Sequence, residues 1–555
     1  MKTHFDLIRL FGKKDSGNSL DGDPVHATMT AFRSRVSHLE KSVDSLISQV
    51  DTLHLFLQGF KEIPLFLEHE NIFISLSSDF GNLGECGKYY WTDDLHGYHL
   101  ICSDKMVYPP DYVERMRSKV ESYGRKAIIA AGGYCFKKPF KSIKSSGIIL
   151  DEAGFIDQDV QADVLNDRAA AYHSSTLKMS RHYFYQDYLS SLWFSIAALE
   201  QQIPMICCAH KQGWLRENEG FADSGDHNPD AERNRDFLIK SHFLPTQKKP
   251  DLSKLIKCNR YFDKIWVMNL NRRPDRWQNI QQISRINKIR VSRFRAIDGA
   301  REPFLSEWKK YFSSKLLKLP EGIDPLTDYK DKFLKYDHYV ARIHFIETRL
   351  GRKAIQSAGA WGYLLSYIKI IRDAIESDYQ RILIFDDDIV LHRHFQDEFD
   401  RHVRQLPCNW KLIMLGAMQH SWEPYVKPSG ALFYHCFGSS IASHAVAIDR
   451  KAMLPILYYA EKMDLPLDEG AIFHVKNVYP EQCCVFLPNL AIQDLQDSDI
   501  NSSAMTTVDK EKWMQIFRWK EGEYVYPSRR RISRINFNIL RKFIAFFPVR
   551  KKGLP

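Results

Sequence analysis

One stretch, Arg381–Phe395 (RILIFDDDIVLHRHF), limits the possible folds of this chain more than any other part of the sequence. An apolar run typical of a buried strand leads directly into three aspartates, and apolar residues follow them. Adjacent carboxylates repel one another and resist burial unless a partner neutralises them. Open α/β sheets bind their ligands at the carboxyl ends of strands. The stretch therefore predicts an α/β sheet with a charged ligand site at this strand end, and the alternative is a solvated acidic turn.

The length of 555 residues exceeds what one hydrophobic core supports, which predicts two large domains. Strand and helix patterns alternate over residues 25–208 and again over residues 264–449, with a polar connection at residues 216–251. This alternation predicts an α/β fold of two tandem Rossmann-like domains with mostly parallel sheets. The predicted boundaries are a leader at residues 1–23, domains at 24–245 and 256–505, and a tail at 506–555.

Two segments of the second pattern carry specific expectations. The spacing of apolar residues predicts a helix over residues 358–376, directly before the acidic strand. Residues 301–355 are charged and irregular, and we expect them to form an insertion without regular structure.

The distribution of charge separates the body of the chain from its end. The net charge is +10, but residues 529–555 contain nine Lys or Arg and no Asp or Glu, so the rest of the chain is close to neutral. A near-neutral body does not predict a nucleic-acid-binding surface. No apolar run reaches the roughly 20 residues that span a bilayer, and the first residues do not form a signal peptide. The ten cysteines have no regular spacing, which fits a reducing cytosol.

The basic segment itself has helical periodicity. In residues 529–552, isoleucines and phenylalanines fall on one helical face and basic residues on the other. Such a helix is typical of binding to an anionic membrane surface. Packing of the apolar face onto the body of the protein and nucleic-acid binding are the two alternatives.

The residue types at the acidic strand end suggest a metal. Asp386 and Asp388 offer hard oxygen ligands, which select Mn²⁺ or Mg²⁺ and bring substrate phosphates with them. The same residues also fit the first motif of haloacid-dehalogenase phosphatases, Asp-x-Asp followed by apolar residues. That class needs a lysine and an acidic pair further along the chain, for which Asp497 and Asp499 are the weak candidates.

A series of motifs surrounds the acidic strand in a fixed order: VMNLNRRPDR, RFRAIDG, GAWGYLLSY, LIFDDDI, SHAVAIDRKA, LPLDEG and LPNLAIQDLQDSDI. Over residues 262–503 this series resembles glycosyltransferase family 25, the lipooligosaccharide and procollagen galactosyltransferases. The resemblance implies a GT-A fold, a UDP-sugar donor, inversion at the anomeric carbon, and Asp386 and Asp388 as ligands of Mn²⁺ or Mg²⁺. It also implies the following nucleotide-sugar-binding residues: Leu270, Arg273, Arg276, Asp298, Gly359, Gly362, Ser366, Asp387 and Gln493.

The resemblance also suggests the catalytic base. An inverting transfer needs a carboxylate that takes the proton of the acceptor hydroxyl, and Asp468 in LPLDEG is the candidate, with Glu469 in reserve. The alternative role for Asp468 is a helix N-cap. Ser498 is expected, with Gln493, to line the donor or acceptor pocket. The chain departs from the family pattern in having Asp where Glu is usual at the first acidic position, and in having Tyr367 where His is frequent.

Residues 26–215 resemble a GT-A, family-2-like glycosyltransferase of bacterial polysaccharide loci, through pieces such as FGNLGECGKYYW, VYPPDYVERM and SLWFSIAALEQQIP. Members of that group carry three aspartates where this chain has Ser103, Asp104 and Lys105. An ammonium group cannot donate a lone pair to a metal and repels it. A glycine-rich segment is replaced by residues 165–168, and an expected aspartate is Ser191. The first domain is therefore predicted to be catalytically degenerate, with metal-independent transfer or glycan binding as alternatives, and its histidines His173, His182 and His210 are too scattered to predict a metal site.

Together these features predict a hexosyltransferase, with galactose as the first expected sugar. The predicted acceptor is a lipid-linked saccharide of lipopolysaccharide, lipooligosaccharide or capsule. The expected location is the inner face of the bacterial cytoplasmic membrane, as a peripheral protein. A procollagen-type acceptor is not expected, because the chain has no secretory signal and ends in KKGLP. The alternatives are a glycan-binding pseudoenzyme and the phosphatase.

Overall fold

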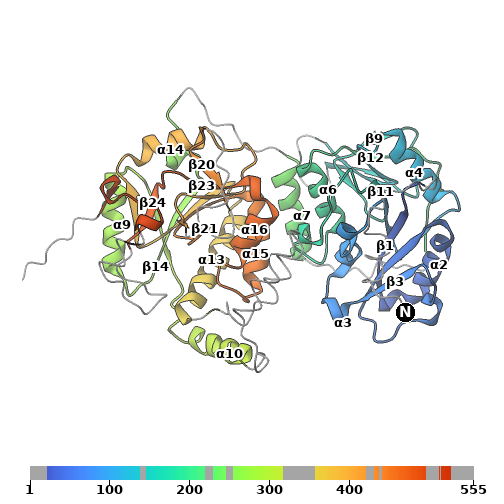
Figure 1. The fold of residues 1–555 in the computed structure, drawn as a ribbon, viewed down its shortest axis with the longest axis horizontal. Coiled ribbons are helices and arrows are strands. Elements are labelled where there is room, and N and C mark those ends of the chain that lie inside the picture. The colour runs from blue at the N-terminus through green and yellow to red at the C-terminus, as the bar shows by residue number, and fades with distance from the viewer. Residues whose placement is uncertain are drawn as a thin grey trace, which may run out of the picture. The chain divides into compact units, whose positions relative to one another are not determined.

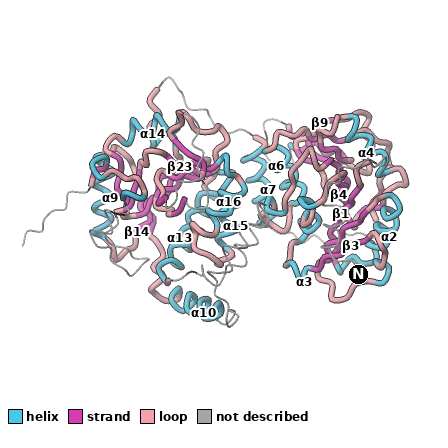
Figure 2. Tube along the Cα trace, viewed as in Figure 1, coloured by secondary structure: helices cyan, strands magenta, loops and turns pink. Residues whose placement is uncertain are grey.

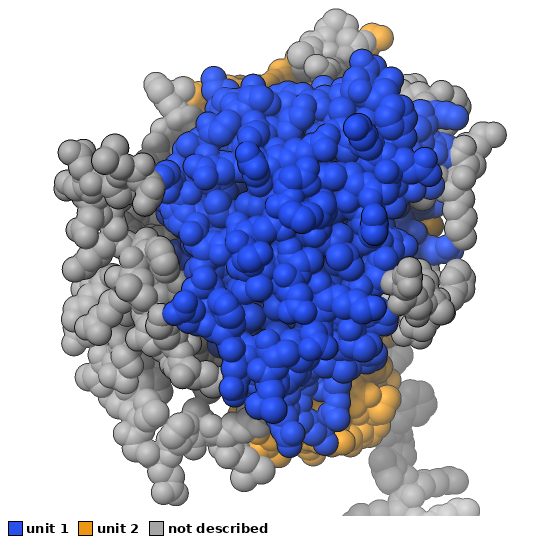
Figure 3. Space-filling view, turned by 90° about the vertical axis from the view of Figure 1, so that its right-hand side faces the viewer, with its two compact units in different colours: residues 1–248 blue, residues 249–555 orange. Residues whose placement is uncertain are grey.

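The computed structural model describes residues 22–137, 140, 146–218, 229–244, 254–316, 355, 357–419, 430–436, 440–494, 512 and 514–526. The chain divides into two compact units, residues 1–248 and 249–555, which Figure 3 colours separately. Most of the predicted leader and the whole basic segment 529–552 lie outside the described residues. No helix among the described residues is long and apolar enough to span a bilayer.

The first unit is built on an eight-stranded mixed sheet (Figures 1 and 2). Its strands follow in the order β3 (Ile72–Leu76), β2 (Thr52–Gln58), β1 (Val25–Phe32), β4 (Tyr98–Ser103), β11 (Ala169–His173), β6 (Ile128–Ala130), β12 (Met205–Cys207) and β9 (Val160–Gln161). Smaller sheets join β10 (Val164–Leu165), β7 (Gly133–Phe136) and β8 (Gly147–Leu150), and β13 (Arg216–Glu217) with β5 (Met106–Val107). The helices are α2 (Val36–Leu46), α3 (Ser77–Phe80), α4 (Tyr112–Ser122), α6 (Ser190–Glu200) and α7 (Pro229–His242).

Helix α2 shows why the sequence forms an element here. Its residues Leu39, Val43 and Leu46 recur at helical spacing and are fully or almost fully buried. They join one apolar cluster with Val25 and Ala27 of the central strand β1. The helix therefore covers one face of the sheet, as the apolar spacing predicts.

The second unit has a seven-stranded sheet of similar construction. Its strands follow in the order β15 (Ser292–Arg295), β14 (Lys264–Asn269), β16 (Arg381–Asp386), β22 (Ala445–Asp449), β18 (Leu412–Met414), β23 (Cys483–Phe486) and β20 (Phe433–His435). Smaller sheets join β24 (Ala491–Gln493), β17 (Ile389–His392) and β25 (Tyr524–Val525), and β19 (Met418–Gln419) with β21 (Ser440–Ile441). The helices are α8 (Cys258–Tyr261), α9 (Pro274–Ile286), α10 (Phe304–Leu316), α13 (Ala358–Glu376), α14 (Phe395–Val403), α15 (Arg450–Glu461) and α16 (Ala471–Val478).

Six strands of each sheet follow the same pattern. The first strand of each series, β1 or β14, has a parallel neighbour on either side. The next strand across, β11 or β22, runs antiparallel to both of its neighbours. Beyond it lie two strands that are parallel to each other, β6 with β12 and β18 with β23. The predicted α/β class is confirmed, and the shared pattern aligns the end of β4 with the end of β16.

Two segments differ from what their composition predicts. Residues 229–242, inside the expected polar connection, form α7, because Phe237, Leu238 and Ile239 give this helix a buried face. The first part of the expected irregular insertion forms α10. There the Trp308 indole donates to the Ile355 carbonyl at 2.8 Å, so tertiary contacts hold a helix in a charged segment.

Buried histidines make the stability of this fold sensitive to acid. Burial lowers the pKa of His99 and of His474 to about 3, and that of His444 to about 4. The unfolded chain takes up these protons near pH 6.5, whereas the folded chain does not. We therefore expect the free energy of unfolding to fall by about 1.4 kcal/mol per pH unit and per histidine as the pH drops below about 6.5.

Urea unfolding at about pH 7 and about pH 5 measures this loss. The variant His99→Gln is expected to have a smaller difference in the free energy of unfolding between the two pH values. His69→Gln, at an exposed position, is expected to leave that difference unchanged. An equal effect of the two substitutions would contradict the assignment to buried histidines.

Candidate active site

A pocket opens in the second unit where the parallel strands β14, β15 and β16 end. Its walls come from the segments after β14 and β15, from the first turns of α13, from the end of β16, and from β24. The lining residues are Met268, Leu270, Arg272, Arg276, Ala296, Ile297, Asp298, Gly299, Ala300, Gly359, Tyr363, Asp386, Asp387, Asp388 and Gln493. The structure thus brings eight of the sequence-predicted site residues to one place, as expected for the carboxyl ends of parallel strands.

Asp387 lines the pocket, but its oxygens already have protein partners. Asn269 donates its side-chain amide to Oδ2 at 2.7 Å, and Arg276 donates to Oδ1 at 2.8 Å. The side chains of Arg276 and Asp387 are each 9% exposed. Arg293 in turn donates to the Asn269 oxygen at 2.8 Å. This chain of contacts makes Asp387 an anchor of the acidic turn, and its role in nucleotide-sugar binding stays a prediction.

Asp386 and Asp388 present the other two carboxylates. The Tyr363 hydroxyl donates to Asp386 Oδ1 at 3.0 Å, and the Gln493 amide donates to Asp388 Oδ1 at 3.4 Å. Burial and the neighbouring carboxylates raise the pKa of Asp386 well above its usual range. Burial raises the pKa of Asp388 to about 7, although Arg276 lies 3.6 Å away. Both carboxylates are therefore protonated at a higher pH than an exposed aspartate, unless further positive charge is bound nearby.

These properties fit a hard divalent cation. Two carboxylates on alternate residues of one turn face the same pocket, and Asp387 between them is tied to Arg276. A cation bound by Asp386 and Asp388 would remove the repulsion that raises their pKa values. Oxygen ligands of this kind are those that Mg²⁺ and Mn²⁺ prefer.

Gly362 and Ser366 act behind the pocket wall, not in it. The Ile297 N–H donates to Ser366 Oγ at 2.8 Å, and that hydroxyl donates to the Gly362 carbonyl at 2.7 Å. Gly362 packs against the backbone of residues 297–299, where a Cβ would lie 2.4 Å from the Ile297 oxygen. The two residues hold the loop that carries Asp298, whereas Gly359 lines the pocket itself.

The variant Gly362→Ala tests this packing. Because the added methyl meets rigid backbone atoms, we expect a loss of roughly 1–3 kcal/mol in the free energy of unfolding. We also expect weaker binding of any ligand that contacts the 297–299 loop. Thermal unfolding measures the first effect, and Gly522→Ala is the matched control, since a Cβ there meets no atom within 4 Å. Equal stability of both variants would contradict the close packing.

The arginines after β14 divide their roles differently from the prediction. Arg273 pairs with Asp275 at 3.0 Å at the start of α9 and does not line the pocket. Its neighbour Arg272 does line it and pairs with Asp298 at 3.1 Å. Sequence reasoning missed Arg272 because consecutive residues in a turn point in different directions. It also missed Tyr363, which the helical spacing of four residues from Gly359 could have revealed.

Asp468 does not line this pocket. It precedes α16, whose N-cap is Gly470, so the alternative role as the N-cap of that helix is wrong. Instead, its Oδ2 accepts a hydrogen bond from the Ala442 N–H at 3.3 Å. Burial and the carboxylates of Asp386 and Asp468 raise the pKa of Tyr367 well above its usual range, so this phenol lies near both acids.

Three further predicted positions lie in the described part of the second unit. Gln493 is in β24, Glu469 is in the same turn as Asp468, and the Tyr367 hydroxyl donates to the Ser443 carbonyl at 3.2 Å. Ser498, Asp497 and Asp499 lie outside the described residues.

Comparison with known proteins identifies the second unit. Residues 262–451 match the family model described as "Glycosyltransferase family 25 (LPS biosynthesis protein)". The chain therefore carries a domain of glycosyltransferase family 25. The predicted family is confirmed for these residues, which include the pocket from Met268 to Asp388. Asp468 and Gln493 are C-terminal to the residues that match the family model.

Two curated proteins are similar to the chain, both named "Glycosyltransferase 25 family member". The one from Drosophila melanogaster is 22% identical over 291 residues, which is 50% of this chain and 42% of the relative. The one from Drosophila pseudoobscura pseudoobscura is 23% identical over 235 residues, 42% of this chain and 32% of the relative. The chain thus spans less than half the length of each relative.

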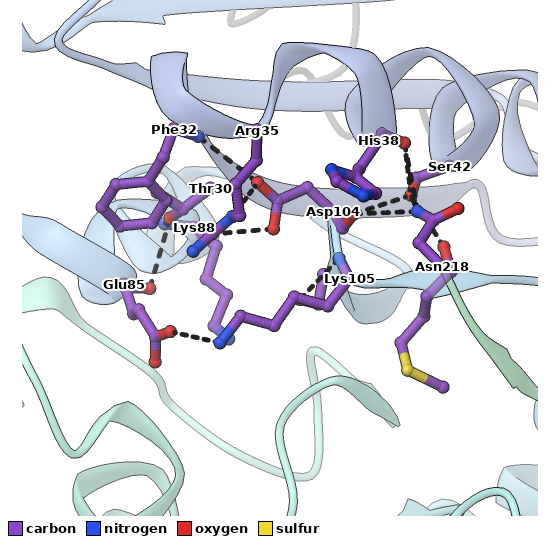
Figure 4. Close-up of polar contacts among 12 residues, drawn as sticks. Thr30, Phe32, Arg35, His38, Ser42, Glu85, Lys88, Asp104, Lys105 and Asn218 are labelled. Carbon is purple, nitrogen blue, oxygen red and sulfur yellow. Dashed lines mark hydrogen bonds and ion pairs between the residues drawn. The ribbon is translucent and has the colours of Figure 1, made fainter. Parts of the chain in front are cut away.

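The equivalent strand end of the first unit has a different chemistry (Figure 4). Asp104 is buried, and Arg35 donates to both of its oxygens at 2.9 Å. This pair corresponds to Arg276 with Asp387 in the family 25 domain. At the flanking positions, however, Ser103 replaces one carboxylate, and Lys105 replaces the other and pairs with a glutamate, Glu85, at 3.5 Å.

The other two departures of the first unit contact each other. Ser191 donates to Asp167 Oδ1 at 2.6 Å, and the Lys88 ammonium lies 2.9 Å from Asp167 Oδ2. The side chains of Lys88 and Asp167 are both buried. A protein ion pair thus occupies the side of this unit where the resemblance places a glycine-rich segment.

Proposed function

We propose that the second unit is a metal-dependent, inverting glycosyltransferase that moves a hexose, galactose first, from a UDP-sugar to a saccharide acceptor. The observation that carries this proposal is the pair Asp386 and Asp388, which share one pocket of a family 25 domain with Arg272 and Arg276. Two carboxylates with raised pKa values call for a cation, and two guanidinium groups suit a diphosphate. The description of the family as an LPS biosynthesis protein supports lipopolysaccharide, lipooligosaccharide or capsule saccharide as the acceptor class.

Each of these residues has a separate proposed role in the reaction. Asp386 and Asp388 would hold Mn²⁺ or Mg²⁺, which would supply charge stabilisation for the departing diphosphate. Arg276 keeps the acidic turn in place through Asp387, and Arg272 orients Asp298 at the pocket wall. Asp468, whose Oδ2 accepts the Ala442 N–H outside the pocket lining, is the proposed base that takes the proton of the acceptor hydroxyl.

The first unit does not catalyse metal-dependent transfer under this proposal. Lys105 pairs with Glu85, and Lys88 pairs with Asp167, so each acid already has a protein cation beside it. Among the described residues of the Asp104 turn, Ser103 and Lys105 replace the two flanking carboxylates. The bacterial location, the lipid-linked acceptor and the membrane contact through residues 529–552 remain part of the proposal, and their support is the basic amphipathic sequence.

Thermal unfolding of the full chain in the presence of nucleotide sugars, with Mn²⁺ and with EDTA, tests this function. Stabilisation by a UDP-hexose that needs the metal, together with release of UDP, is the expected result. Saccharide binding that EDTA does not change would favour a glycan-binding pseudoenzyme. Release of phosphate from an aryl phosphate would favour the phosphatase, for which Asp386 and Asp388 also suffice as the first motif.

A further inference from the structure

Three side chains with metal-binding atoms converge in the first unit, away from the aligned strand end. Asp23 precedes β1, His96 precedes β4, and His173 ends β11. One ligand atom from each lies within 4.8 Å of the other two. Strand β4 starts near His96 and ends at Ser103. The cluster therefore lies about 20 Å from the Asp104 turn, at the opposite ends of the strands.

Each histidine lies at the spacing of two zinc ligands from one oxygen of Asp23, and the two histidines approach different oxygens. His96 Nε2 lies 3.4 Å from Asp23 Oδ1, and His173 Nε2 lies 3.3 Å from Asp23 Oδ2. Ligand atoms about 2.1 Å from a zinc ion at tetrahedral angles are about 3.4 Å apart. Two histidines and one carboxylate are also a ligand set that zinc accepts, with a further position for water.

The second ring nitrogen of each histidine is held by a serine. His173 Nδ1 lies 2.6 Å from Ser175 Oγ, and His96 Nδ1 lies 3.1 Å from Ser174 Oγ. These consecutive serines sit in the turn after β11 and orient both rings so that Nε2 faces Asp23. A histidine that binds a metal through Nε2 usually donates its Nδ1–H to a neighbour. At His173 the Ser175 hydroxyl can accept that hydrogen bond, in place of the contact in which Nδ1 accepts the Ser175 N–H at 3.1 Å.

Arg125 is the residue that competes with an ion at this place. Its NH1 lies 2.6 Å from Asp23 Oδ2 and 3.2 Å from His173 Nε2. Its Nε keeps a second carboxylate, Glu121, at 2.6 Å, and its guanidinium lies 5.3 Å from the centre of the Tyr98 ring. These partners allow the side chain to remain bound when NH1 leaves Asp23.

We infer that Asp23, His96 and His173 form a zinc site that ties the start of β1 to the segments before β4 and after β11, and that Arg125 closes this site when no metal is bound. The side chain of His96 is 62% exposed, which gives an ion a route of entry. The sequence did not predict a metal site at His173, because Asp23 and His96 are far from it along the chain and only the fold brings the three together. The site belongs to the first unit alone and does not depend on the proposed transferase activity.

Zinc titration of the full chain against a chromophoric chelator tests the inference, with excess Mg²⁺ present to fill oxygen-ligand sites, since Mg²⁺ does not favour imidazole. We expect His96→Ala and Asp23→Asn to weaken zinc binding by at least ~100-fold. Arg125→Gln is expected to tighten it by at least roughly fivefold, because a competing cation is gone. His69→Ala, an exposed histidine outside the cluster, is the matched control.

Cobalt supplies an independent readout, because tetrahedral Co²⁺ with nitrogen ligands absorbs visible light far more strongly than the hydrated ion. The wild-type chain is expected to give this spectrum and His96→Ala to lose it, with both proteins folded by circular dichroism. Equal zinc affinity in wild type, His96→Ala and His69→Ala, or a cobalt spectrum typical of the hydrated ion, would overturn the inference.

Discussion

Replacement of Asp388 by alanine is expected to reduce kcat/KM for transfer from a UDP-sugar by at least ~10³-fold, because the metal loses one of its two protein ligands. Folding is not expected to suffer. Burial already raises the pKa of Asp388 to about 7, so the fold gains little from its negative charge. Steady-state kinetics with Mn²⁺ and a thermal unfolding curve for the same protein separate the two effects.

The equivalent position of the first unit provides the control. Lys105 occupies, at the end of β4, the place that Asp388 occupies at the end of β16. We expect Lys105→Ala to leave transfer unchanged, because Ser103 and Lys105 stand at the Asp104 turn where the acidic turn of the second unit has Asp386 and Asp388. A large loss of activity in Lys105→Ala with full activity in Asp388→Ala would mean that the two units have the opposite roles.

The second large effect is expected from Arg276→Ala. This change leaves Asp387, whose side chain is 9% exposed, without its cationic partner, and removal of one member of a buried pair costs about 3–5 kcal/mol. The acidic turn would also lose its alignment, so we expect transfer activity to fall even at temperatures where the variant is folded. Denaturant unfolding and kinetics at low temperature measure these two losses.

Arg272→Ala is the matched control for stability. Arg272 is four residues earlier, its side chain is 39% exposed, and its pair with Asp298 at 3.1 Å is of the kind that contributes at most about 1 kcal/mol. The analogous change in the first unit, Arg35→Ala, removes the partner of Asp104, whose side chain is 1% exposed. We expect it to destabilise that unit without a direct effect on transfer. Equal stability of Arg276→Ala and Arg272→Ala would contradict the anchoring role of Asp387.

Long periodic segments were predictable in detail. The helix expected over residues 358–376 is α13, with the same bounds, because its apolar residues repeat over five turns and the Ser357 hydroxyl accepts the Ala360 N–H. Segments α7 and α10 were not predictable, since charged residues surround the few apolar side chains that pack, which are buried in α7 and half-buried over residues 304–312 of α10. For such segments the energy of tertiary packing exceeds local preference.

The site residues show the same division. The order of motifs was sufficient to bring Leu270, Asp298, Gly359 and Asp386 to one pocket, because strand ends in an α/β sheet meet at one edge. The order of motifs could not show that Arg272, and not Arg273, lines the pocket. It also could not show that Gly359 lines the pocket whereas Gly362 supports the loop behind it. Those distinctions depend on side-chain direction in turns and helices, which changes from one residue to the next.

The sequence by itself determined that the chain has two α/β patterns and that only the later one ends a strand with three acids. The reason is that apolar periodicity and local charge are properties of neighbouring residues. Only the tertiary structure decided that the middle acid of each strand end, Asp104 or Asp387, is an anchor held by an arginine from another element. It also decided that Asp23 and two distant histidines meet, since contacts between residues far apart in the chain exist only after strands have paired.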